Sequence, residues 1–265
     1  MTAPTWDPRQ YLRHADHRTR PFRDLLARID APATARIADL GCGAGNVTAL
    51  MAERWPEARI TGYDSSPQML AEAGKHAGPL LDFAPADAAT WAPTETYDLI
   101  VSNALLQWVP GHADRFGVWL DALAPGGALA FQVPGNFTAP SHTILAELRE
   151  SPRWRPLLGG VGDRTAAVLD PADYLGRLTA LGCEGVDVWE TTYLQVLTGA
   201  DPVLDWVKGT ALRPVLTALA DAPEERDAFI AQYAEALRAA YPPGPHGTVF
   251  PFRRIFAVAR KPQGS

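Results

Sequence analysis

The sequence predicts an α/β protein built on a mainly parallel sheet that is covered by helices on both faces. From residue 36 onward, short apolar runs typical of buried strands alternate with segments of helical periodicity. The first of these runs, 35–40, leads into a glycine-dense turn, GCGAG, and then into a helical pattern. A strand, a glycine turn and a helix start together form a cradle for a polar ligand, because glycines allow close approach and the helix start presents unpaired N–H groups.

The expected elements follow one another in regular order. Strands are predicted at 35–40, 59–64, 80–87, 97–104, 127–134, 185–193 and 253–261. Helices are predicted at 8–29, 45–54, 67–76, 112–123, 141–150 and 171–181. Residues 200–241 are expected to be helical almost throughout, with breaks at Pro214 and Pro223, so a helical insertion precedes the last strand. Such alternation is typical of parallel sheets.

The chain has 265 residues, of which 47% are hydrophobic and 20% charged, which is the composition of an ordinary globular protein. We expect a single domain over 1–265 with a cofactor-binding core at 30–135. The helices at 8–29 and 200–241 are predicted to cover the substrate site, because α/β folds bind ligands at the carboxyl edge of the sheet.

Charge and composition exclude several classes of partner. The formal net charge is −6 and no basic stripe occurs, so we expect no nucleic acid partner. No run of eighteen apolar residues and no signal-peptide pattern is present, so we expect no membrane association or export. Cys42 and Cys183 are predicted to be reduced, which favours the cytoplasm. His14 and His17 lack further ligands at metal spacing, so no metal is expected. We expect a monomer or a weak homodimer.

The glycine turn does not have the spacing of a dinucleotide-binding fingerprint. Its glycines are Gly41, Gly43 and Gly45, and Asn46 stands where G-x-G-x-x-G requires the third glycine. Asp39, just before the turn, would repel a pyrophosphate. The turn therefore suits a ligand with an ammonium group or hydroxyls better than a polyphosphate.

Two further carboxylates follow successive strands. Asp64 ends the second strand, where a carboxylate can accept hydrogen bonds from both hydroxyls of a ribose. Its alternative role is that of a helix N-cap, for which Ser65 and Ser66 compete. Asp87 follows the third strand and can accept from an adenine amino group, or it is a simple loop carboxylate. Together with Asp39, these residues favour a ligand that is positively charged or at least is not a polyphosphate, and Asp64 supports a nucleoside.

Four ordered motifs, DLGCGAGN, GYDSSPQML, PADAATW and YDLIVSNALLQWV, resemble the class I S-adenosylmethionine-dependent methyltransferases over about residues 35–134. This resemblance implies a seven-stranded Rossmann-like sheet with a reversed last hairpin and S-adenosyl-L-methionine as cofactor. It places Gly41 and Gly43 beneath the methionine part, Asp64 on the ribose, and Asn103 near the sulfonium. The full set of implied cofactor-binding residues is Asp39, Gly41, Gly43, Asp64, Ser65, Met69, Asp87, Ala88 and Asn103, with Met69 stacked on the adenine and Asp87 and Ala88 flanking it.

Further segments, among them YLRHADHRTRPFRDLLARI, VPGNFTAPSH and DWVKGTALRPVL, resemble members of this class that esterify one carboxylate of a small unsaturated tricarboxylic acid. A carboxylate is already ionised at neutral pH, so catalysis needs positioning and no general base. Arginine binds the remaining carboxylates best, because its planar fork matches them. The predicted substrate-binding residues are Arg18, Trp108, Tyr193, Arg213, Tyr241 and Arg254.

Several alternatives remain open at this stage. Arg20 competes with Arg18, since two residues two apart on a helix face different ways. Arg213 is otherwise a solvent-facing cation at a helix end, and Arg254 an edge-strand cation on a strand with one buried face. A methyltransferase for a phenol or an amine would need a general base, and none is convincing. An oxidoreductase that uses NAD(P) would need a third glycine at position 46, where this chain has asparagine. A non-catalytic regulator would bind S-adenosylmethionine without transferring its methyl group.

Overall fold

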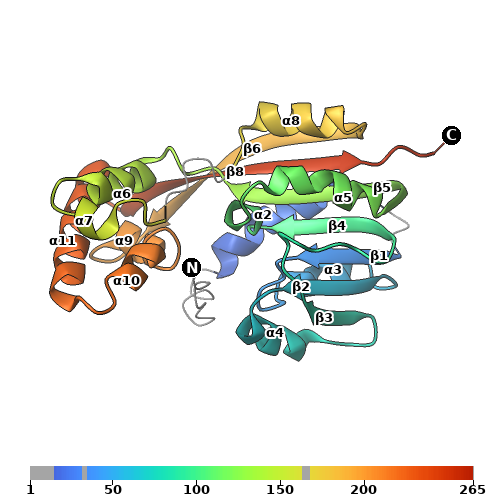
Figure 1. Ribbon diagram of the computed structural model, residues 1–265, viewed down its shortest axis with the longest axis horizontal. Helices are drawn as coiled ribbons and strands as arrows, with labels where there is room; N and C mark the ends of the chain where they lie inside the picture. Colours follow the sequence, from blue (N-terminus) through green and yellow to red (C-terminus); the bar gives the residue numbers. More distant parts are fainter. Residues whose placement is uncertain (1–14, 32–34, 163–167, 265) are drawn as a thin grey trace. The chain divides into compact units, whose positions relative to one another are not determined.

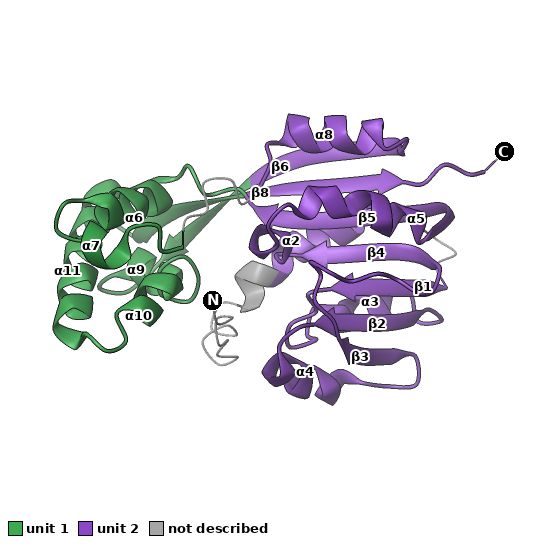
Figure 2. Ribbon diagram, in the orientation of Figure 1, with its two compact units in different colours: residues 1–5, 135–166, 192–253 green, residues 6–134, 167–191, 254–265 purple. Residues whose placement is uncertain are grey.

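The computed structural model describes residues 15–31, 35–162 and 168–264 (Figure 1), with side chains from residue 19 onward. Contacts divide this part of the chain into two compact units (Figure 2). The sheet unit contains residues 15–31, 35–134, 168–191 and 254–264, and the helical unit contains residues 135–162 and 192–253. The expectation of a single domain stays a prediction, and each unit is described by itself.

The sheet has the expected topology. Its strands are β1 (Arg36–Leu40), β2 (Arg59–Asp64), β3 (Leu81–Pro85), β4 (Tyr97–Asn103), β5 (Leu123–Pro134), β6 (Glu184–Leu197) and β8 (Gly247–Arg260), in the order β3-β2-β1-β4-β5-β8-β6. Strands β1 to β5 pair in parallel, and β8 runs antiparallel to β5. A two-residue strand, β7 (Pro243–Gly244), also pairs with β8. The predicted parallel sheet with a reversed last hairpin is confirmed.

The helices of the sheet unit agree with the sequence pattern apart from their ends. They are α2 (Ala15–Arg28), α3 (Thr48–Arg54), α4 (Pro67–Ala73), α5 (Phe116–Asp121) and α8 (Pro171–Ala180). The ends that were predicted as α-helix at 74–76 and 112–115 are 3-10 turns instead, a tighter geometry that is frequent at helix termini. The expected helix 8–29 is described from residue 15, and residues 8–14 lie outside the described part.

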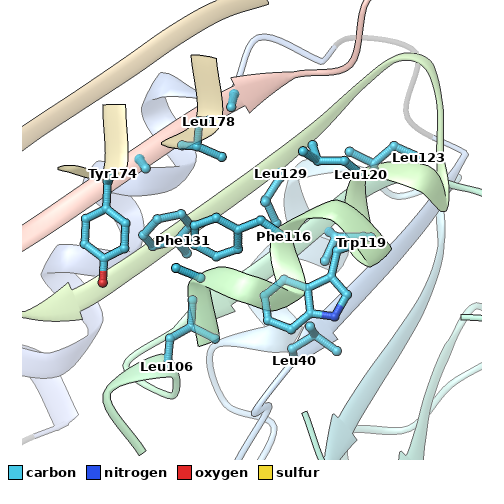
Figure 3. Packing of buried hydrophobic residues seen from close by; sticks show 14 of the residues in the cluster. Leu40, Leu106, Phe116, Trp119, Leu120, Leu123, Leu129, Phe131, Tyr174 and Leu178 are labelled. Carbon is cyan, nitrogen blue, oxygen red and sulfur yellow. The ribbon is translucent and has the colours of Figure 1, made fainter. Parts of the chain in front are cut away.

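Aromatic rings fill the core between the sheet and the helices α5 and α8 (Figure 3). Phe116 packs against Phe131 and Trp119, with ring centroids 5.2 and 5.9 Å apart. The buried Tyr174 hydroxyl lies 2.8 Å from His112 Nε2, so its polar end is satisfied. Strand β1 is buried along Ile37–Leu40, as expected for a central parallel strand covered on both faces. This packing holds the carboxyl ends of β1 to β4 at one edge of the sheet.

The helical unit has a core of its own. Its helices are α6 (Pro140–Glu150), α7 (Arg155–Leu158), α9 (Pro202–Lys208), α10 (Arg213–Ala218) and α11 (Pro223–Ala240). Trp154, Phe229, Tyr233 and Phe250 are fully buried among them. Pro214 and Pro223 do not interrupt helices but stand in their first turns, where proline has no N–H bond to lose. The predicted helical block is therefore three separate helices.

Strands β6 and β8 are longer than the sequence pattern predicted, and both run from one unit into the other. Along the end of β6, Tyr193, Gln195 and Leu197 are buried whereas Leu194 and Val196 are exposed, which is a period of two. The same period of two appears at the start of β8, after a proline- and glycine-rich stretch at 242–247. That stretch forms the tight hairpin of β7 and β8.

Membrane-spanning helices and metal-binding clusters are both absent from the residues that the structure describes. No described helix is both long and apolar enough to cross a membrane. Within the same residues, no group of three or more His, Cys, Asp or Glu side chains is placed to hold a metal ion.

Candidate active site

The glycine turn after β1 is held against the end of β2. The N–H groups of Gly41 and Cys42 both donate to the Tyr63 carbonyl, at 2.7 and 3.0 Å. Gly41 has a φ of +79°, and a Cβ there would lie 2.7 Å from Leu105 Cβ, so no side chain fits. Gly43 has a φ of +55°, and a Cβ on it would meet nothing within 4 Å. The turn is therefore packed on one side and leaves open space at Gly43.

Asp64 connects this turn to α4. Its Oδ2 accepts from the Gly43 N–H at 3.0 Å, and its Oδ1 accepts from the Ser66 N–H at 2.8 Å. Ser66 is the N-cap of α4, because its Oγ accepts from the Met69 N–H. Asp64 is thus not the cap, which removes one of its two alternative roles. Each carboxylate oxygen has two lone pairs, so both can accept one more hydrogen bond from a ligand.

Asp39 is fully buried at the end of β1. Its Oδ2 accepts from the Thr48 hydroxyl at 2.7 Å, and its Oδ1 has no hydrogen-bond partner among the described residues. Burial raises the pKa of this carboxyl to about 7, with the Thr48 hydrogen bond opposing the rise and the charge of Asp64 adding to it. The negative charge at this edge therefore depends on Asp64 and Asp87 more than the sequence analysis assumed.

Cys42 lies inside the turn as a buried, free thiol, and Cys183 is free as well. Burial raises the pKa of the Cys42 thiol, and the carboxylates of Asp39 and Asp64 raise it further. A thiol held in its protonated form is a poor nucleophile. Cys42 is thus unsuited to covalent catalysis.

A pocket of about 110 Å³ opens at the carboxyl ends of β1 to β4 within the sheet unit. It is lined by Leu40, Gly41, Tyr63, Asp64, Ser65, Ala86, Asp87, Ala88, Leu105, Trp108 and Val109. Its mixture of apolar walls with a few carboxylates is typical of small-molecule sites. Among these described lining residues there is no histidine or lysine.

The pocket brings together six of the residues that sequence reasoning singled out, namely Gly41, Asp64, Ser65, Asp87, Ala88 and Trp108. Asp87 Oδ1 accepts from the Ala89 N–H at 2.9 Å, which fixes the carboxylate at the rim. Met69 is buried in α4 and is not among the lining residues, and neither are Asp39, Gly43 and Asn103. Sequence reasoning missed the other five lining residues, although the apolar run after β4 was a signal for the last two: Leu40, Tyr63, Ala86, Leu105 and Val109.

Three side chains form a buried hydrogen-bonded chain across the ends of β4, β5 and β8. Arg254 Nη1 donates to Gln132 Oε1 at 2.9 Å, and Gln132 Nε2 donates to Asn103 Oδ1 at 2.7 Å. Gln132 lies directly opposite Asn103 in the β4–β5 register. The chain orients the Asn103 amide with its oxygen toward Gln132. Sequence reasoning missed Gln132, which had no signal because it stands alone in an apolar strand.

The alternative role of Arg254, that of an edge-strand cation on a strand with one buried face, is wrong, whereas its expected substrate contact stays a prediction. Arg254 is only 6% exposed, and Ile255 and Phe256 after it are both fully buried, so β8 has two covered faces. The physical reason is that β8 lies between β5 and β6 and is not an edge strand. Arg254 is therefore a buried cation at the carboxyl edge of β5. Its neighbour Arg253, by contrast, donates to the Gly135 carbonyl at 3.4 Å.

Ala104 follows Asn103 in a left-handed conformation, with a φ of +54°. Its N–H donates to the Gln132 carbonyl at 2.8 Å, and its carbonyl accepts from Gln107 Nε2 at 2.6 Å. A left-handed alanine costs about 1–2 kcal/mol. Such strain is concentrated at functional sites, where the surrounding structure imposes it. Here it turns the chain sharply from Asn103 toward the pocket residues Leu105 and Trp108.

The other predicted substrate residues lie in α2 or in the helical unit. Tyr193 is buried on β6, and Arg213 is half-buried at the start of α10. The Tyr241 hydroxyl accepts from the Ser141 N–H at 3.0 Å and its ring packs on Phe250, so this side chain supports the start of α6. Arg18 lies in α2 with its side chain outside the described part, and the competing Arg20 is exposed.

Comparison with known proteins now adds to this geometry. Residues 37–127 match the family model described as a methyltransferase domain. The trans-aconitate 2-methyltransferase of Streptomyces coelicolor is 66% identical, in an alignment that covers 100% of this chain and 89% of the relative. The enzyme of the same name from Rhodococcus jostii is 52% identical, over 96% of this chain and 99% of the relative. The chain belongs to this family.

A solved structure shows the same fold at low identity. The phosphoethanolamine N-methyltransferase 2 of Haemonchus contortus, in complex with S-adenosyl-L-methionine, matches with a TM-score of 0.55 and 19% identity. The match covers 92% of this chain and 53% of that protein. As a member of its family, the chain is an enzyme, a methyltransferase whose sheet follows the order found here.

Replacing Asp64 tests the expected ribose contact. We expect Asp64→Ala to weaken the binding of S-adenosyl-L-methionine roughly 10- to 100-fold, since a hydrogen bond to a charged group contributes about 1.5–3 kcal/mol. Asp64→Asn keeps one acceptor oxygen, so its affinity for S-adenosyl-L-methionine should lie between that of the wild type and that of Asp64→Ala. Titration calorimetry measures the dissociation constants.

The matched control for this experiment is Asp98→Ala. Asp98 also uses its carboxylate to accept two backbone N–H groups, those of Ala35 and Arg36, but at the opposite end of the sheet. It should lower stability without changing cofactor affinity. An unchanged dissociation constant for Asp64→Ala would rule out the ribose role.

The raised pKa of Asp39 predicts a specific pH dependence of stability. The carboxyl ionises near pH 3.8 in the unfolded chain and near pH 7 in the folded one. Its protonated form therefore stabilises the fold below about pH 4, and this contribution is lost as the pH rises to about 7. Relative to Asp39→Asn, the wild-type free energy of unfolding should fall over this window, by up to about 4 kcal/mol. Urea titrations of both proteins at several pH values measure the difference; a difference independent of pH would contradict it.

Proposed function

We propose that this protein transfers the methyl group of S-adenosyl-L-methionine to one carboxylate of trans-aconitate, forming a methyl ester. Trans-aconitate is the small unsaturated tricarboxylic acid that the sequence resemblance implied. The observation that carries the proposal is the 66% identity over the full chain to a relative of that name. The pocket at the carboxyl edge of the sheet supports it, because its residues suit the cofactor.

The residues present fit S-adenosyl-L-methionine. The space beside Gly43 admits the methionine part, and the Asp64 carboxylate has lone pairs for the two ribose hydroxyls. Asp87 and Ala88 line the same pocket, where they would flank the adenine. We assign Asp39, Ser65, Met69 and Asn103 supporting roles in the same site. When bound, the cofactor supplies an activated methyl group on its positively charged sulfur.

The chemistry asks this chain for positioning and for exclusion of water. The accepting carboxylate has a reference pKa of about 4 and is ionised at neutral pH, so no residue has to remove a proton from it. The lack of histidine and lysine among the described lining residues agrees with this requirement. Because the two reacting charges neutralise each other, a dry site favours the reaction, and alignment contributes up to about 7–11 kcal/mol in the best cases.

Arginines are proposed to hold the carboxylates that do not react. Arg254 has the strongest support, because it is buried and Gln132 links it to Asn103 at the carboxyl end of β4. Arg213 and Arg18 remain proposed partners of the other carboxylate. Trp108, which lines the pocket, and Tyr193 and Tyr241 are proposed as aromatic neighbours of the reacting carboxylate, which a tight ion pair would make less nucleophilic.

The proposed function is tested by methyl transfer from labelled S-adenosyl-L-methionine. We expect the wild-type enzyme to label trans-aconitate as a base-labile ester, and to label citrate and isocitrate much more slowly. Labelling of a phenol or an amine in preference to all three acids would overturn the proposal. So would tight cofactor binding without transfer to any acid.

The role of Arg254 is tested by Arg254→Gln. We expect the KM for trans-aconitate to rise about 10- to 100-fold, because a charge-assisted contact to the acid is lost, while the dissociation constant of S-adenosyl-L-methionine changes little. Arg253→Gln, at the adjacent position of β8, is the control and should leave the KM near its wild-type value. A variant that loses cofactor affinity and keeps its KM would show that Arg254 only supports Asn103.

We further propose a cytoplasmic protein that acts as a monomer or a weak homodimer. The two free cysteines support the reducing compartment. The net charge of −6 supports small-molecule partners over nucleic acid.

A further inference from the structure

The last turn of α6 buries an arginine that the sequence analysis did not single out. Arg149 is 6% exposed, and its Nε has no hydrogen-bond partner. Among the described residues, none forms an ion pair or hydrogen bond with its guanidinium. An arginine cannot become neutral to avoid this situation, and an unpaired buried charge is costly. A partner from outside the described chain would remove that cost.

Three acidic residues described in the helical unit are engaged with other partners. Glu150, the next residue, accepts from the Gly160 N–H at 3.0 Å and lies 3.7 Å from Arg155 Nε. Asp205 pairs with Lys208 at 3.0 Å, and Asp201 binds Arg238 through both carboxylate oxygens. These carboxylates therefore do not neutralise Arg149.

Arg149 also does not serve as a simple cap of its own helix. A cation in the last turn of a helix commonly donates to the terminal carbonyls. Here the Leu148 carbonyl accepts instead from the Ser151 N–H, at 3.2 Å, and from the Ser151 hydroxyl, at 2.7 Å. Capping of the last carbonyls of α6 therefore does not explain why an arginine is buried at this position.

A glycine packs closely beside the guanidinium. A Cβ on Gly162 would lie 3.6 Å from Arg149 Nη1 and 2.9 Å from Pro214 Cβ, so a side chain there would collide with Pro214. Gly162 has a φ of +64°, which any other residue would adopt under strain. The glycine therefore lets the backbone approach α10 next to the arginine.

We propose that Arg149 is a carboxylate-binding residue of the helical unit and takes one carboxylate of a small polycarboxylic acid. Its planar fork matches a carboxylate in two parallel hydrogen bonds, and burial strengthens such a charge-assisted pair. The need for an anion follows from the unpaired cation alone. The choice of a carboxylate as that anion rests on the proposed function.

The test is equilibrium binding of trans-aconitate and citrate to the full-length protein, with saturating S-adenosylhomocysteine so that no methyl group is transferred. We expect Arg149→Met to raise the dissociation constant of the tricarboxylate about 10- to 100-fold. Arg149→Lys keeps the charge but loses the planar fork, so its dissociation constant should lie between those of the wild type and Arg149→Met. Arg155→Met is the matched control, because Arg155 is an exposed arginine of the same unit, and it should bind like the wild type.

Thermal unfolding supplies a second readout. Without ligand, Arg149→Met should unfold at the wild-type temperature or above it, because the variant no longer buries an unpaired charge. Tricarboxylate should raise the unfolding temperature of the wild type and of Arg155→Met, and raise that of Arg149→Met much less. If Arg149→Met does not fold, the intermediate affinity of Arg149→Lys decides.

Equal tricarboxylate affinity in the wild type and Arg149→Met would overturn the inference. An equal rise in unfolding temperature with sulfate at matched ionic strength would overturn the assignment to a carboxylate. Methyl transfer to trans-aconitate together with an unchanged affinity in Arg149→Met would remove this inference and leave the proposed function intact. Tricarboxylate binding that depends on Arg149, without any methyl transfer, would support this inference and overturn the proposed function.

Discussion

The hydrogen bonds between the glycine turn and the end of β2 set the geometry on which the cofactor site depends. The Tyr63 carbonyl accepts two successive N–H groups of the turn, and the next donor, at Gly43, is taken by Asp64. This places the carboxylate that is proposed to bind the ribose and the open space at Gly43 in one fixed arrangement. The same carboxylate also holds the Ser66 N–H at the start of α4, so the turn and two elements share one group.

The buried polar groups of this protein are arranged at a cost to stability. Asp39 is buried with one satisfied oxygen, Arg254 is buried in a chain of three side chains, and Ala104 is held in a strained conformation beside that chain. Burying polar groups and straining the backbone both oppose folding. They lie at the carboxyl ends of β1, β4 and β5, where they surround the place that a methyl donor and its acceptor would share.

A reaction between a sulfonium and a carboxylate explains why the site contains fixed polar groups and apolar walls rather than an acid and base pair. The accepting group is ionised before it binds, so its orientation and desolvation determine the rate. Because many unrelated reactions occur on this fold, the sheet alone does not name the acceptor. We propose that arginines do so by their charge: Arg254 is buried and donates to Gln132, and Arg149 is buried with its Nε unbonded.

Much of the sheet unit could be predicted from local pattern, since strand-like runs alternate with helical patterns, and Asp39, Asp64 and Asn103 stand at the carboxyl ends of β1, β2 and β4. Gly41, Asp64 and Asp87 were found in this way, because parallel strands bring such ends to one edge. Gln132, Arg149 and the burial of Arg254 could not be found, because each depends on which segments distant in the chain lie beside it. Local periodicity in the sequence therefore determined the order of the elements along the chain and the polar edge of the sheet, whereas tertiary packing alone decided the order of the strands within the sheet and which charged side chains lost their contact with water.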